Sequence, residues 1–438
     1  MKNVLLKLEA ALNSRSAKIG IVGLGYVGLP LAVAFAEAGF KTLGIDIQQK
    51  RVDSVNRGQS YIADVSSKIL KSAVAGNHLN ATTDQSKLSE TDAICICVPT
   101  PLTETKDPDL SHVIYESREI AKYLRPGQLI VLESTTHPGT TREVVLPVLE
   151  SSKLKCGVDF YLAYSPERVD PGNKKYRIKN TPKIVGGINP QSTDLAKLLY
   201  SKVADVVVPV SSPEAAEMTK IFENVFRSVN IALVNELAEL CHNMNVSVWE
   251  VIEAASTKPF GYMPFYPGPG VGGHCIPLDP YYLANKAREF DFHTRFIELA
   301  AETNERMPYY TVSRILEALN AAGKPLKKAK VFVLGVTYKK DTEDTRESPS
   351  LKIIQLLHEK GADVIYNDPY IPKIPLAQGN ISSTELTRQN LSQADCVVVA
   401  TDHSSYKMKE VVAHSKLIFD ARGATRGLRN DNIVRLGE

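Results

Sequence analysis

Short runs of apolar residues alternate along this chain with longer stretches in which apolar residues recur every three or four positions. A short run predicts a buried strand, and helical spacing predicts a helix packed on one face. The predicted strands of the first half lie at residues 18–23, 41–46, 93–98, 128–133, 159–164 and 183–186. Helical stretches separate them, beginning with 30–38. This alternation favours a doubly wound sheet of parallel strands over residues 18–210.

The pattern changes after residue 210, where Ser212 and Pro213 are typical of a helix start. Helical spacing then continues from 213 to 243, which predicts a helix of about 30 residues, roughly 45 Å long. Its apolar positions are Ala216, Ile221, Val225, Val229, Ala232, Leu233, Leu237 and Leu240. Together with a second helical stretch at 294–322, this helix predicts a central helical domain over residues 211–323.

Strands and helices alternate again in the last quarter of the chain. The predicted strands are 330–336, 363–367, 396–400 and 417–420, with a helix at 350–359. They predict a smaller α/β domain over residues 324–438. The expected fold class is therefore α/β, with two Rossmann-like doubly wound domains joined by a central helical domain that contains a long spine helix.

Residues 1–17 predict a short amphipathic leader helix, because leucines stand at positions 5, 6, 8 and 12. We expect this helix to pack on the body of the protein or on a partner subunit. Glu9 and the lack of a continuous apolar core argue against a signal peptide. No apolar run reaches the roughly 18 residues that a membrane helix needs, so membrane insertion is not expected.

Net charge and cysteine usage narrow the class of protein. The net charge of +3 over 438 residues gives no argument for a nucleic-acid or membrane-surface partner. The six cysteines lack the spacing of a disulfide framework, which favours a reducing cytoplasm. The nine histidines show no ligand spacing, so we predict no metal site.

The sequence Gly-Leu-Gly-Tyr-Val-Gly at 23–28 follows the first predicted strand and opens the first predicted helix. In this setting the glycines allow a tight turn and close approach of a pyrophosphate to the helix N-terminus. Asp46 ends the next strand and is expected to accept from ribose hydroxyls, which favours NAD over NADP. Two alternatives stay open: the glycines could be structural, and Arg51 could accommodate a 2′-phosphate.

Cys275 lies in a glycine-rich loop, Gly-Gly-His-Cys-Ile-Pro, at 272–277. Beside a nucleotide fold, a loop thiol indicates hydride transfer in which the cysteine holds the substrate. Such a thiol permits two oxidations at one carbon, from alcohol to acid, with a thioester between them. A buried, inert cysteine is the ordinary alternative. A dyad with His274 is not expected, because adjacent residues rarely place their side chains in that geometry.

Several longer motifs occur in one order across nearly the whole chain. They lie at 22–30, 134–135, 164–168, Lys220 with Asn224, 272–279, 339–342 and 345–348. With these motifs the chain resembles the UDP-glucose/UDP-N-acetylhexosamine dehydrogenase family. The resemblance implies a cofactor domain, a central domain that dimerises and a UDP-binding domain. It also implies NAD as cofactor, a UDP-sugar as substrate and at least a homodimer.

The resemblance further implies which residues form the site. The implied catalytic residues are Cys275, Lys220, Asn224, Asp279, Glu167 and Thr135. The implied cofactor-binding residues are Gly23, Gly25, Tyr26, Val27, Gly28, Asp46, Arg51, Thr100, Thr135 and Arg346. The implied substrate-binding residues are Glu167, Arg168, Lys220, Asn224, Tyr266, Gly272, Lys339 and Arg422.

In the implied mechanism Cys275 forms a thiohemiacetal and then a thioester, which water activated by Glu167 with Thr135 releases as the acid. Lys220 and Asn224 would bind the oxyanion, and Asp279 would handle a proton through water. Ordinary structural roles remain possible for three of these residues. Glu167 could pair with Arg168, Lys220 could be solvated on its helix, and Asp279 could cap one.

The same motifs indicate which sugar is oxidised. Gly-Gly-His-Cys-Ile-Pro-Leu-Asp-Pro resembles the N-acetylhexosamine branch, since the glucose branch has a lysine where Leu278 stands. The loop 265–270 points the same way. Asp170, in the stretch 168–173, resembles enzymes of UDP-N-acetyl-D-glucosamine, because the mannosamine type more often has leucine there. The expected reaction is four-electron oxidation of its 6-hydroxymethyl group.

Other substrates and other classes of protein are kept as alternatives. The substrate alternatives are UDP-N-acetylmannosamine, UDP-N-acetylgalactosamine and UDP-glucose. A two-electron dehydrogenase would stop at the aldehyde and would not need Cys275. A nucleotide-sugar-binding protein without catalysis would produce no NADH at all.

Overall fold

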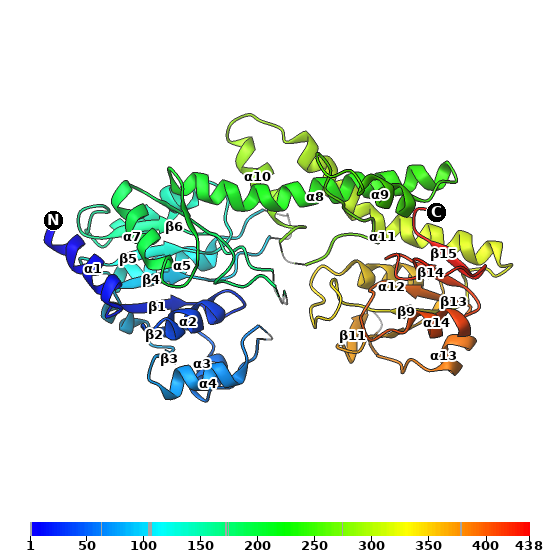
Figure 1. Ribbon diagram of the computed structural model, residues 1–438, viewed down its shortest axis with the longest axis horizontal. Coiled ribbons are helices and arrows are strands. Elements are labelled where there is room, and N and C mark those ends of the chain that lie inside the picture. Colours follow the sequence, from blue (N-terminus) through cyan, green and yellow to red (C-terminus); the bar gives the residue numbers. More distant parts are fainter. Residues whose placement is uncertain are drawn as a thin grey trace. The chain divides into compact units, whose positions relative to one another are not determined.

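The computed structural model describes residues 2–62, 64–103, 107–170, 173, 175–273, 275–376 and 379–438, which form two compact units (Figure 1). The first unit comprises Met1–Glu223 and Tyr281–Phe292. The second comprises Asn224–Pro280 and His293–Glu438. Three residues named in the sequence analysis lie outside the described residues: Pro171 and Gly172 of the stretch 168–173, and His274.

The first unit is built on an eight-stranded sheet with the order β3-β2-β1-β4-β5-β6-β7-β8. Its strands are β1 (Lys18–Val22), β2 (Lys41–Ile45), β3 (Leu79–Thr82), β4 (Ala93–Ile96), β5 (Leu129–Leu132), β6 (Tyr161–Tyr164), β7 (Lys183–Gly187) and β8 (Val207–Pro209). All neighbours pair in parallel except β6 and β7, which are antiparallel. The chain therefore reverses direction once in a sheet that we predicted to be wholly parallel.

Helices cover both faces of this sheet (Figure 1). They are α1 (Lys2–Ser14), α2 (Gly28–Glu37), α3 (Gln49–Asn56), α4 (Ser67–Ala75), α5 (Ser111–Tyr123), α6 (Leu146–Glu150) and α7 (Pro190–Tyr200), with short turns η1 (Gln85–Glu90) and η2 (Thr140–Val145). Alternate strand residues enter different cores: Leu129 and Val131 pack with α2 and α7, whereas Ile130 and Leu132 pack with α5 and α6. This period of two is what a sheet buried on both faces requires.

The leader helix α1 packs on the body of the first unit. Leu8 and Leu12 are buried in the same core as α2 and α7. The Lys202 ammonium also donates to Asn13 Oδ1 at 3.1 Å. We expected this helix to pack either on the body of the protein or on a partner subunit, and in the structure it packs on the body of the protein.

The second unit contains a five-stranded sheet, wholly parallel, with the order β10-β9-β13-β14-β15. Its strands are β9 (Lys330–Leu334), β10 (Asp363–Asn367), β13 (Cys396–Val399), β14 (Ile418–Asp420) and β15 (Ile433–Arg435). Helices α12 (Pro349–Glu359), α13 (Arg388–Gln393) and α14 (Met408–His414) cover it, and β11 (Lys373–Leu376) pairs with β12 (Gly379–Ser382) as an antiparallel hairpin. The predicted α/β fold class, with two doubly wound sheets, is confirmed.

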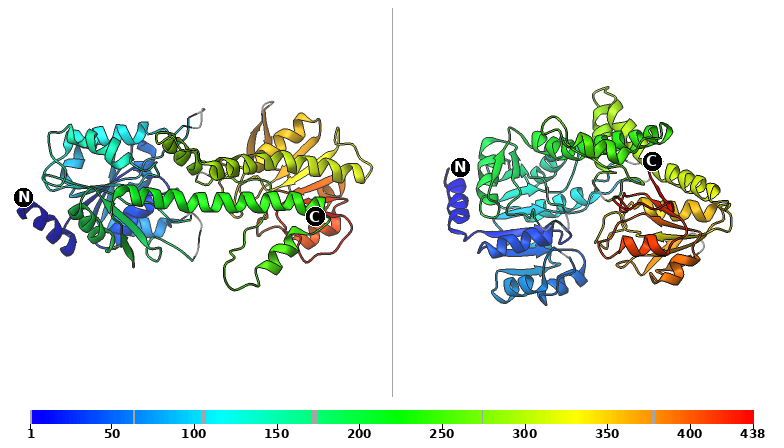
Figure 2. Two further views of the ribbon diagram at one scale, coloured as in Figure 1. Left: turned by 90° about the horizontal axis from the view of Figure 1, so that it is seen from above. Right: turned by 45° about the vertical axis from the view of Figure 1, so that its right-hand side comes forward.

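The remaining helices are α8 (Pro213–Asn243), α9 (Val248–Ala255), α10 (Asp279–Arg288) and α11 (Arg295–Ala321). Asn304 of α11 donates to the Ser228 carbonyl of α8 at 3.1 Å, and the views in Figure 2 show these two helices side by side. The predicted apolar stripe of α8 is only partly buried, since Leu233 is 62% exposed and Leu240 is 52% exposed. No helix within the described part of the chain is long and apolar enough to cross a membrane.

Candidate active site

The carboxyl ends of the strands gather the predicted site residues of the first unit. Gly23 follows β1, Asp46 follows β2, Thr100 follows β4, Thr135 follows β5 and Glu167 follows β6. These strands run in parallel, so all five residues lie at one edge of the sheet. Ligand sites of doubly wound sheets form at that edge.

The turn between β1 and α2 has the geometry of a phosphate-binding turn. Gly23 has a φ of 89°, and a Cβ there would lie 2.8 Å from the Cys97 carbonyl oxygen. A Cβ on Gly28 would lie 1.8 Å from the Gly23 carbonyl oxygen, so only glycine fits. A Cβ on Gly25 would meet nothing within 4 Å. The turn is therefore closed against the sheet and open above Gly25, where a pyrophosphate can approach the start of α2. Within the same turn Tyr26 is exposed and Val27 directly precedes α2.

The Asp46 carboxylate is buried beside this turn, with only 5% of the residue exposed. Its Oδ2 accepts from the Leu24 backbone N–H at 2.9 Å, and its Oδ1 accepts from the Gln48 N–H at 2.8 Å. Arg51 Nη1 donates to the same Oδ2 at 3.2 Å. A carboxylate has about four lone-pair positions, so Asp46 keeps capacity for a ribose hydroxyl. Because Arg51 is paired with Asp46, this geometry fits NAD and not a 2′-phosphate.

Thr100 and Thr135 contact each other at the edge of the sheet. Thr100 Oγ1 donates to the Thr135 carbonyl oxygen at 2.6 Å. The Thr100 carbonyl in turn accepts from the Tyr282 hydroxyl of α10. The Thr135 hydroxyl makes no hydrogen bond to another described residue, so it can serve a ligand or water.

Glu167 belongs to a buried cluster of charges that sequence reasoning missed. Its Oε1 accepts from the backbone N–H groups of Arg168 and Val169 at 2.8 and 2.7 Å. Its Oε2 accepts from Lys183 Nζ at 3.2 Å, and the same ammonium donates to Glu133 Oε2 at 2.6 Å. The structure thus places Lys183, and not the Arg168 guanidinium, beside the Glu167 carboxylate.

The two carboxyl groups of this cluster respond differently to their surroundings. Burial alone would raise the pKa of Glu167, but Lys183 and the two backbone donors lower this pKa below the ordinary glutamate value. Burial raises the pKa of Glu133, an effect that Lys183 only partly offsets. These surroundings therefore favour the ionised form of Glu167 and disfavour that of Glu133.

Arg168 directs its guanidinium away from Glu167. Its Nε and Nη2 donate to the two carboxylate oxygens of Glu223 on α8, at 3.2 and 2.5 Å, and Nη1 donates to the Pro182 carbonyl at 2.7 Å. A two-bond arginine–carboxylate pair is geometrically specific. Arg168 therefore anchors the loop after β6 to α8.

Cys275 is the exposed cysteine among the six, all of which the structure describes. Burial raises the pKa of the other five thiols, to about 11 at Cys156 and to about 12 at Cys396. A thiol must be accessible and able to ionise before it can act as a nucleophile. By its accessibility Cys275 is the candidate nucleophile, and the expectation that this cysteine could be buried is wrong.

The glycines before Cys275 allow its loop to pack tightly on the segment that follows β9. A Cβ on Gly272 would lie 2.5 Å from the Tyr338 Cβ, and a Cβ on Gly273 would lie 2.8 Å from the Tyr338 ring. The Gly273 N–H donates to the Arg346 carbonyl at 3.0 Å. Close packing against Tyr338 therefore requires glycine at the first two positions of the motif Gly-Gly-His-Cys. The same packing holds the loop that carries Cys275.

Asn224 and Asp279 are brought together by the fold. Asn224 Nδ2 donates to Asp279 Oδ2 at 2.5 Å, and both residues are buried. The Asp279 N–H donates to the Cys275 carbonyl at 2.8 Å, so Asp279 also closes the cysteine turn. Lys220 precedes Asn224 by one turn of α8 and is half-buried. Its ammonium pairs with no other described residue, so it is available to an oxyanion.

The remaining predicted substrate residues lie in the second unit. Arg422 donates from Nε to the Ala400 carbonyl at 2.9 Å and from Nη2 to the Tyr338 carbonyl at 3.4 Å. Lys339 lies in the same segment as Tyr338 and is half-buried. Arg346 is partly exposed and pairs with Asp344 at 2.6 Å. These contacts place Lys339, Arg346 and Arg422 around the segment on which the cysteine loop packs.

Tyr266 stacks on Trp249, with ring centroids 6.1 Å apart and planes 16° apart. The Arg426 guanidinium carbon lies 5.0 Å from the Tyr266 ring centroid. Tyr266 is 43% exposed, so one part of its ring is held by this packing and the rest can meet a ligand.

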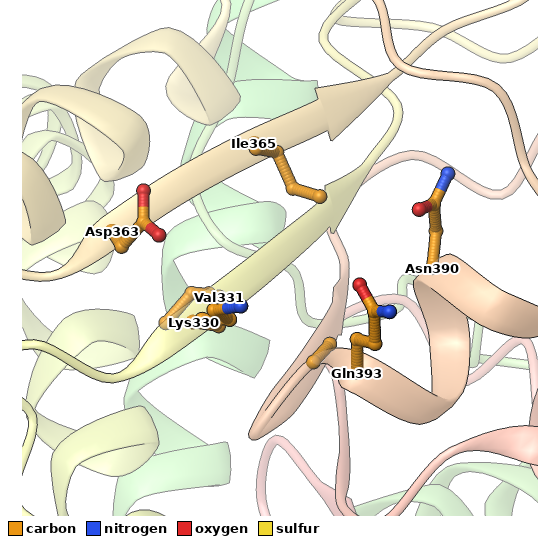
Figure 3. Close-up of a pocket in the computed structure, with 7 residues that line it drawn as sticks. Lys330, Val331, Asp363, Ile365, Asn390 and Gln393 are labelled. Carbon is orange, nitrogen blue, oxygen red and sulfur yellow. The ribbon is translucent and has the colours of Figure 1, made fainter.

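A separate hollow in the second unit does not coincide with these residues. It is lined by Lys330 and Val331 of β9, Asp363 and Ile365 of β10, and Asn390, Gln393 and Ala394 at α13 (Figure 3). Lys330 and Asp363 are the first residues of their strands. The hollow therefore lies toward the amino ends of the sheet, opposite the edge where ligand sites of such sheets form.

Three sequence profiles of one family match successive parts of this chain. They are the profiles of the UDP-glucose/GDP-mannose dehydrogenase family for the NAD binding domain, the central domain and the UDP binding domain. They match residues 17–204, 214–306 and 332–427, respectively. The NAD profile covers the glycine turn, Asp46 and the Glu167 cluster.

Known proteins resemble the chain over nearly its whole length. The UDP-N-acetyl-D-mannosamine dehydrogenase of Pyrococcus horikoshii is 38% identical over 92% of this chain and 95% of its own. The UDP-N-acetyl-D-glucosamine 6-dehydrogenase of Pseudomonas aeruginosa is 35% identical over 90% of this chain and 92% of its own. The solved structure of the UDP-D-ManNAc dehydrogenase from P. horikoshii aligns with a TM-score of 0.88 and 34% identity, covering 96% of this chain and 99% of that one.

Proposed function

Because this chain belongs to the UDP-glucose/GDP-mannose dehydrogenase family of NAD-dependent nucleotide-sugar dehydrogenases, we propose that it oxidises C6 of UDP-N-acetyl-D-glucosamine to a carboxylate. The exposed thiol of Cys275, beside the buried Asn224–Asp279 pair, carries this proposal. A two-electron dehydrogenase would not need such a thiol. A binding protein without catalysis would need neither the thiol nor the pair.

The first unit supplies the cofactor site. NAD, when bound, accepts one hydride in each of two oxidations. The turn at Gly23, Gly25 and Gly28 would hold its pyrophosphate, and Asp46 would accept from a ribose hydroxyl. Tyr26, Val27, Arg51, Thr100 and Thr135 are the other proposed cofactor-binding residues of this unit, and Arg346 is the one proposed from the second unit.

In the first oxidation the 6-hydroxyl group becomes an aldehyde. Asp279, through water, accepts the hydroxyl proton, and the Lys220 ammonium stabilises the negative charge that develops on the oxygen. Asn224 has two amide N–H donors. One is used on Asp279, so the second can reach the same oxygen.

Cys275 then converts the aldehyde into an intermediate that can be oxidised again. Its thiolate adds to the C6 carbon and forms a thiohemiacetal, and Lys220 again stabilises the oxygen. The second oxidation leaves a thioester between C6 and Cys275. Glu167, with Thr135, removes a proton from water as it attacks the thioester. The attack releases the carboxylate and returns the Cys275 thiol.

The proposed substrate-binding residues are Glu167, Arg168, Lys220, Asn224, Tyr266, Gly272, Lys339 and Arg422. Lys339 and Arg422 are suited to phosphate oxygens because both are cationic, and Arg422 Nη2 donates to the carbonyl of Tyr338, the residue before Lys339. Tyr266 offers an aromatic face, which suits a base or a sugar ring.

The choice of the gluco epimer rests on Asp170 in the loop after β6. UDP-N-acetyl-D-mannosamine is the second candidate substrate. It is favoured by the relatives, because most of the similar proteins are named UDP-N-acetyl-D-mannosamine dehydrogenase.

We propose four segments in the chain: a leader helix at 1–17, the NAD domain at 18–210, a helical dimerisation domain at 211–323 and the UDP-sugar domain at 324–438. The protein is at least a homodimer, since Phe226, Leu233 and Leu240 leave an exposed apolar face along α8. Its six free cysteines fit a reducing cytoplasm.

The purified protein should be incubated with NAD and, separately, with the UDP derivatives of N-acetylglucosamine, N-acetylmannosamine, N-acetylgalactosamine and glucose. The proposal predicts two NADH for each UDP-N-acetylglucosamine consumed, with the C6 acid as product. One NADH for each sugar would indicate a two-electron dehydrogenase, and none a binding protein. Two NADH with the mannosamine substrate alone would establish the second candidate.

A further inference from the structure

The reversal of the first sheet brings a lysine to its ligand-binding edge. Strand β7 runs antiparallel to β6, with Tyr164 opposite Gly186. Extending this register by three residues sets Glu167 opposite Lys183, the first residue of β7. Had β7 run parallel to β6, its first residue would lie at the opposite edge. The reversal therefore accounts for the presence of Lys183 next to Glu167.

The Lys183 ammonium is shared between two carboxyl groups and is cut off from solvent. Its side chain is 5% exposed, and that of Glu133 is wholly buried. Nζ lies 2.6 Å from Glu133 Oε2 and 3.2 Å from Glu167 Oε2. It also lies 5.1 Å from the centroid of the Tyr200 ring. In such surroundings an ion pair is poorly screened, so each partner strongly affects the charge of the other.

Groups on four elements face this ammonium. Glu133 extends from the end of β5, and Glu167 follows β6. The Tyr200 hydroxyl of α7 donates to Glu133 Oε1 and lies 3.5 Å from the Cys95 Sγ of β4. Burial raises the pKa of the Tyr200 hydroxyl and of the Cys95 and Cys97 thiols, which favours their neutral forms. The charge balance is therefore set by one lysine and two glutamates.

We propose that Lys183 is a positioning residue that keeps Glu167 ionised and its Oε2 oriented for proton transfer, and that Glu133 competes with Glu167 for the same ammonium. This inference rests on the proposed role of Glu167 in hydrolysis of the thioester. Two backbone N–H groups fix Oε1 of Glu167, and Lys183 fixes Oε2. The carboxylate is therefore held at both oxygens, and a lone pair of Oε2 is left for water.

Two substitutions are predicted to shift the pH dependence of hydrolysis in opposite directions. Lys183→Met removes the positive charge, so the pKa of Glu167 rises and the acid limb of the hydrolysis rate moves up by about 1–3 pH units. Glu133→Gln removes the competitor, so Glu167 receives the whole ammonium and the acid limb moves to lower pH. A role in folding alone would change stability in both variants without these opposite shifts.

The rate of hydrolysis can be measured directly in a single turnover. Excess enzyme with NAD is mixed with UDP-N-acetyl-D-glucosamine over a range of pH, quenched in acid and analysed by intact-protein mass for the Cys275 thioester. We expect the thioester to accumulate in Lys183→Met at neutral pH, where the unmodified protein has already released the acid. Lys183→Arg keeps the charge and should restore much of the rate. Lys155→Met, at an exposed lysine paired with Glu150, is the matched control and should behave as the unmodified protein.

Two outcomes separate this inference from the proposed function. If Glu167→Gln hydrolyses the thioester at the normal rate, the proposed role of Glu167 is wrong. If Glu167→Gln accumulates the thioester but Lys183→Met and Glu133→Gln keep the normal pH profile, only the role of Lys183 is overturned. Should Lys183→Met fail to fold by circular dichroism, the direction of the Glu133→Gln shift decides: a shift to lower pH supports the inference, and no shift refutes it.

Discussion

Asn224 on α8 donates from Nδ2 to Asp279 Oδ2 at 2.5 Å, and this hydrogen bond joins two residues that are 55 positions apart in the chain. Asp279 is the first residue of α10, and its N–H also donates to the carbonyl of Cys275. Asn224 therefore orients a carboxylate whose own backbone closes the turn of the cysteine. This arrangement gives Asn224 a positioning contact in addition to its proposed contact with an oxyanion.

Asn224→Ala is predicted to slow the first oxidation by about 10²–10³-fold, because the oxyanion loses a donor and Asp279 loses the group that orients it. KM for the sugar nucleotide should change much less, since the lost contacts act on the reacting oxygen. The first turnover of NADH formation measures this effect. Asn230→Ala is the control on the same helix, because Asn230 Nδ2 donates to the Phe226 carbonyl one turn earlier. Equal losses in both variants would mean that α8 itself had been disturbed.

Asp46→Ala is predicted to weaken NAD binding by about 1–3 kcal/mol, because charge-assisted hydrogen bonds to the ribose are lost. The substitution also leaves Arg51 without its carboxylate partner, so the preference for NAD over NADP should fall. Calorimetric titration with each dinucleotide measures both effects. Unchanged NAD affinity would show that Asp46 is not the ribose ligand.

The buried carboxyl group of Glu116 should make the free energy of unfolding depend on pH, and this effect can be measured without substrate or NAD. Burial raises the pKa of this carboxyl group on α5 to about 7, against 4.5 for an ordinary glutamate. Because the folded protein holds the Glu116 proton more tightly than the unfolded chain does, this proton stabilises the fold. The stabilisation is complete below about pH 4.5 and is lost as the pH rises through about 7. Relative to Glu116→Gln, the unmodified protein should therefore lose about 1–3 kcal/mol of unfolding free energy between pH 5 and 8. Denaturant titrations at both pH values test this, with the exposed Glu37→Gln as a control that should show no such difference.

The exposed face of α8 predicts association of the chain. Leu233 is 62% exposed, and a two-fold interface between two copies of α8 would bury its side chain. Leu233→Asp should therefore raise the dissociation constant of the dimer. Leu6→Asp, at a residue 59% exposed on α1, should leave that constant unchanged. Light scattering of the unmodified protein at micromolar concentration gives the direct answer, and the monomer mass of 48.1 kDa there would contradict the prediction.

The elements that the sequence predicts best are those with long or uniform patterns. The helix α8 spans the predicted residues 213–243, and β10 spans the predicted 363–367. Short elements of mixed composition, such as β3 and the β11–β12 hairpin, were missed because four residues carry too little periodicity. The reversed direction of β7 was also missed, since strand direction depends on tertiary pairing and not on local sequence.

The site residues show the same division. The glycine turn and Asp46 were predictable because their spacing follows from the geometry of one strand–helix–strand unit. Lys183 was not, because a lysine at the start of a strand ordinarily faces solvent. Its burial results from the direction of β7 and from two glutamates, Glu133 and Glu167, that follow β5 and β6. Likewise, that Glu167 would pair with Lys183 and not with the adjacent Arg168 depends on the position of Glu223 on α8.

Acid formation by Cys275→Ser tests most directly whether this chain carries out a four-electron oxidation through a thioester. Serine lacks the low pKa and the nucleophilicity of the thiol, so the thioester should not form readily. Cys156→Ser, at a half-buried cysteine, is the matched control. With UDP-N-acetyl-D-glucosamine and NAD, the unmodified protein and Cys156→Ser should each form one C6 acid for every two NADH. Cys275→Ser should form no acid, and acid formation by Cys275→Ser at the normal rate would contradict the thioester mechanism.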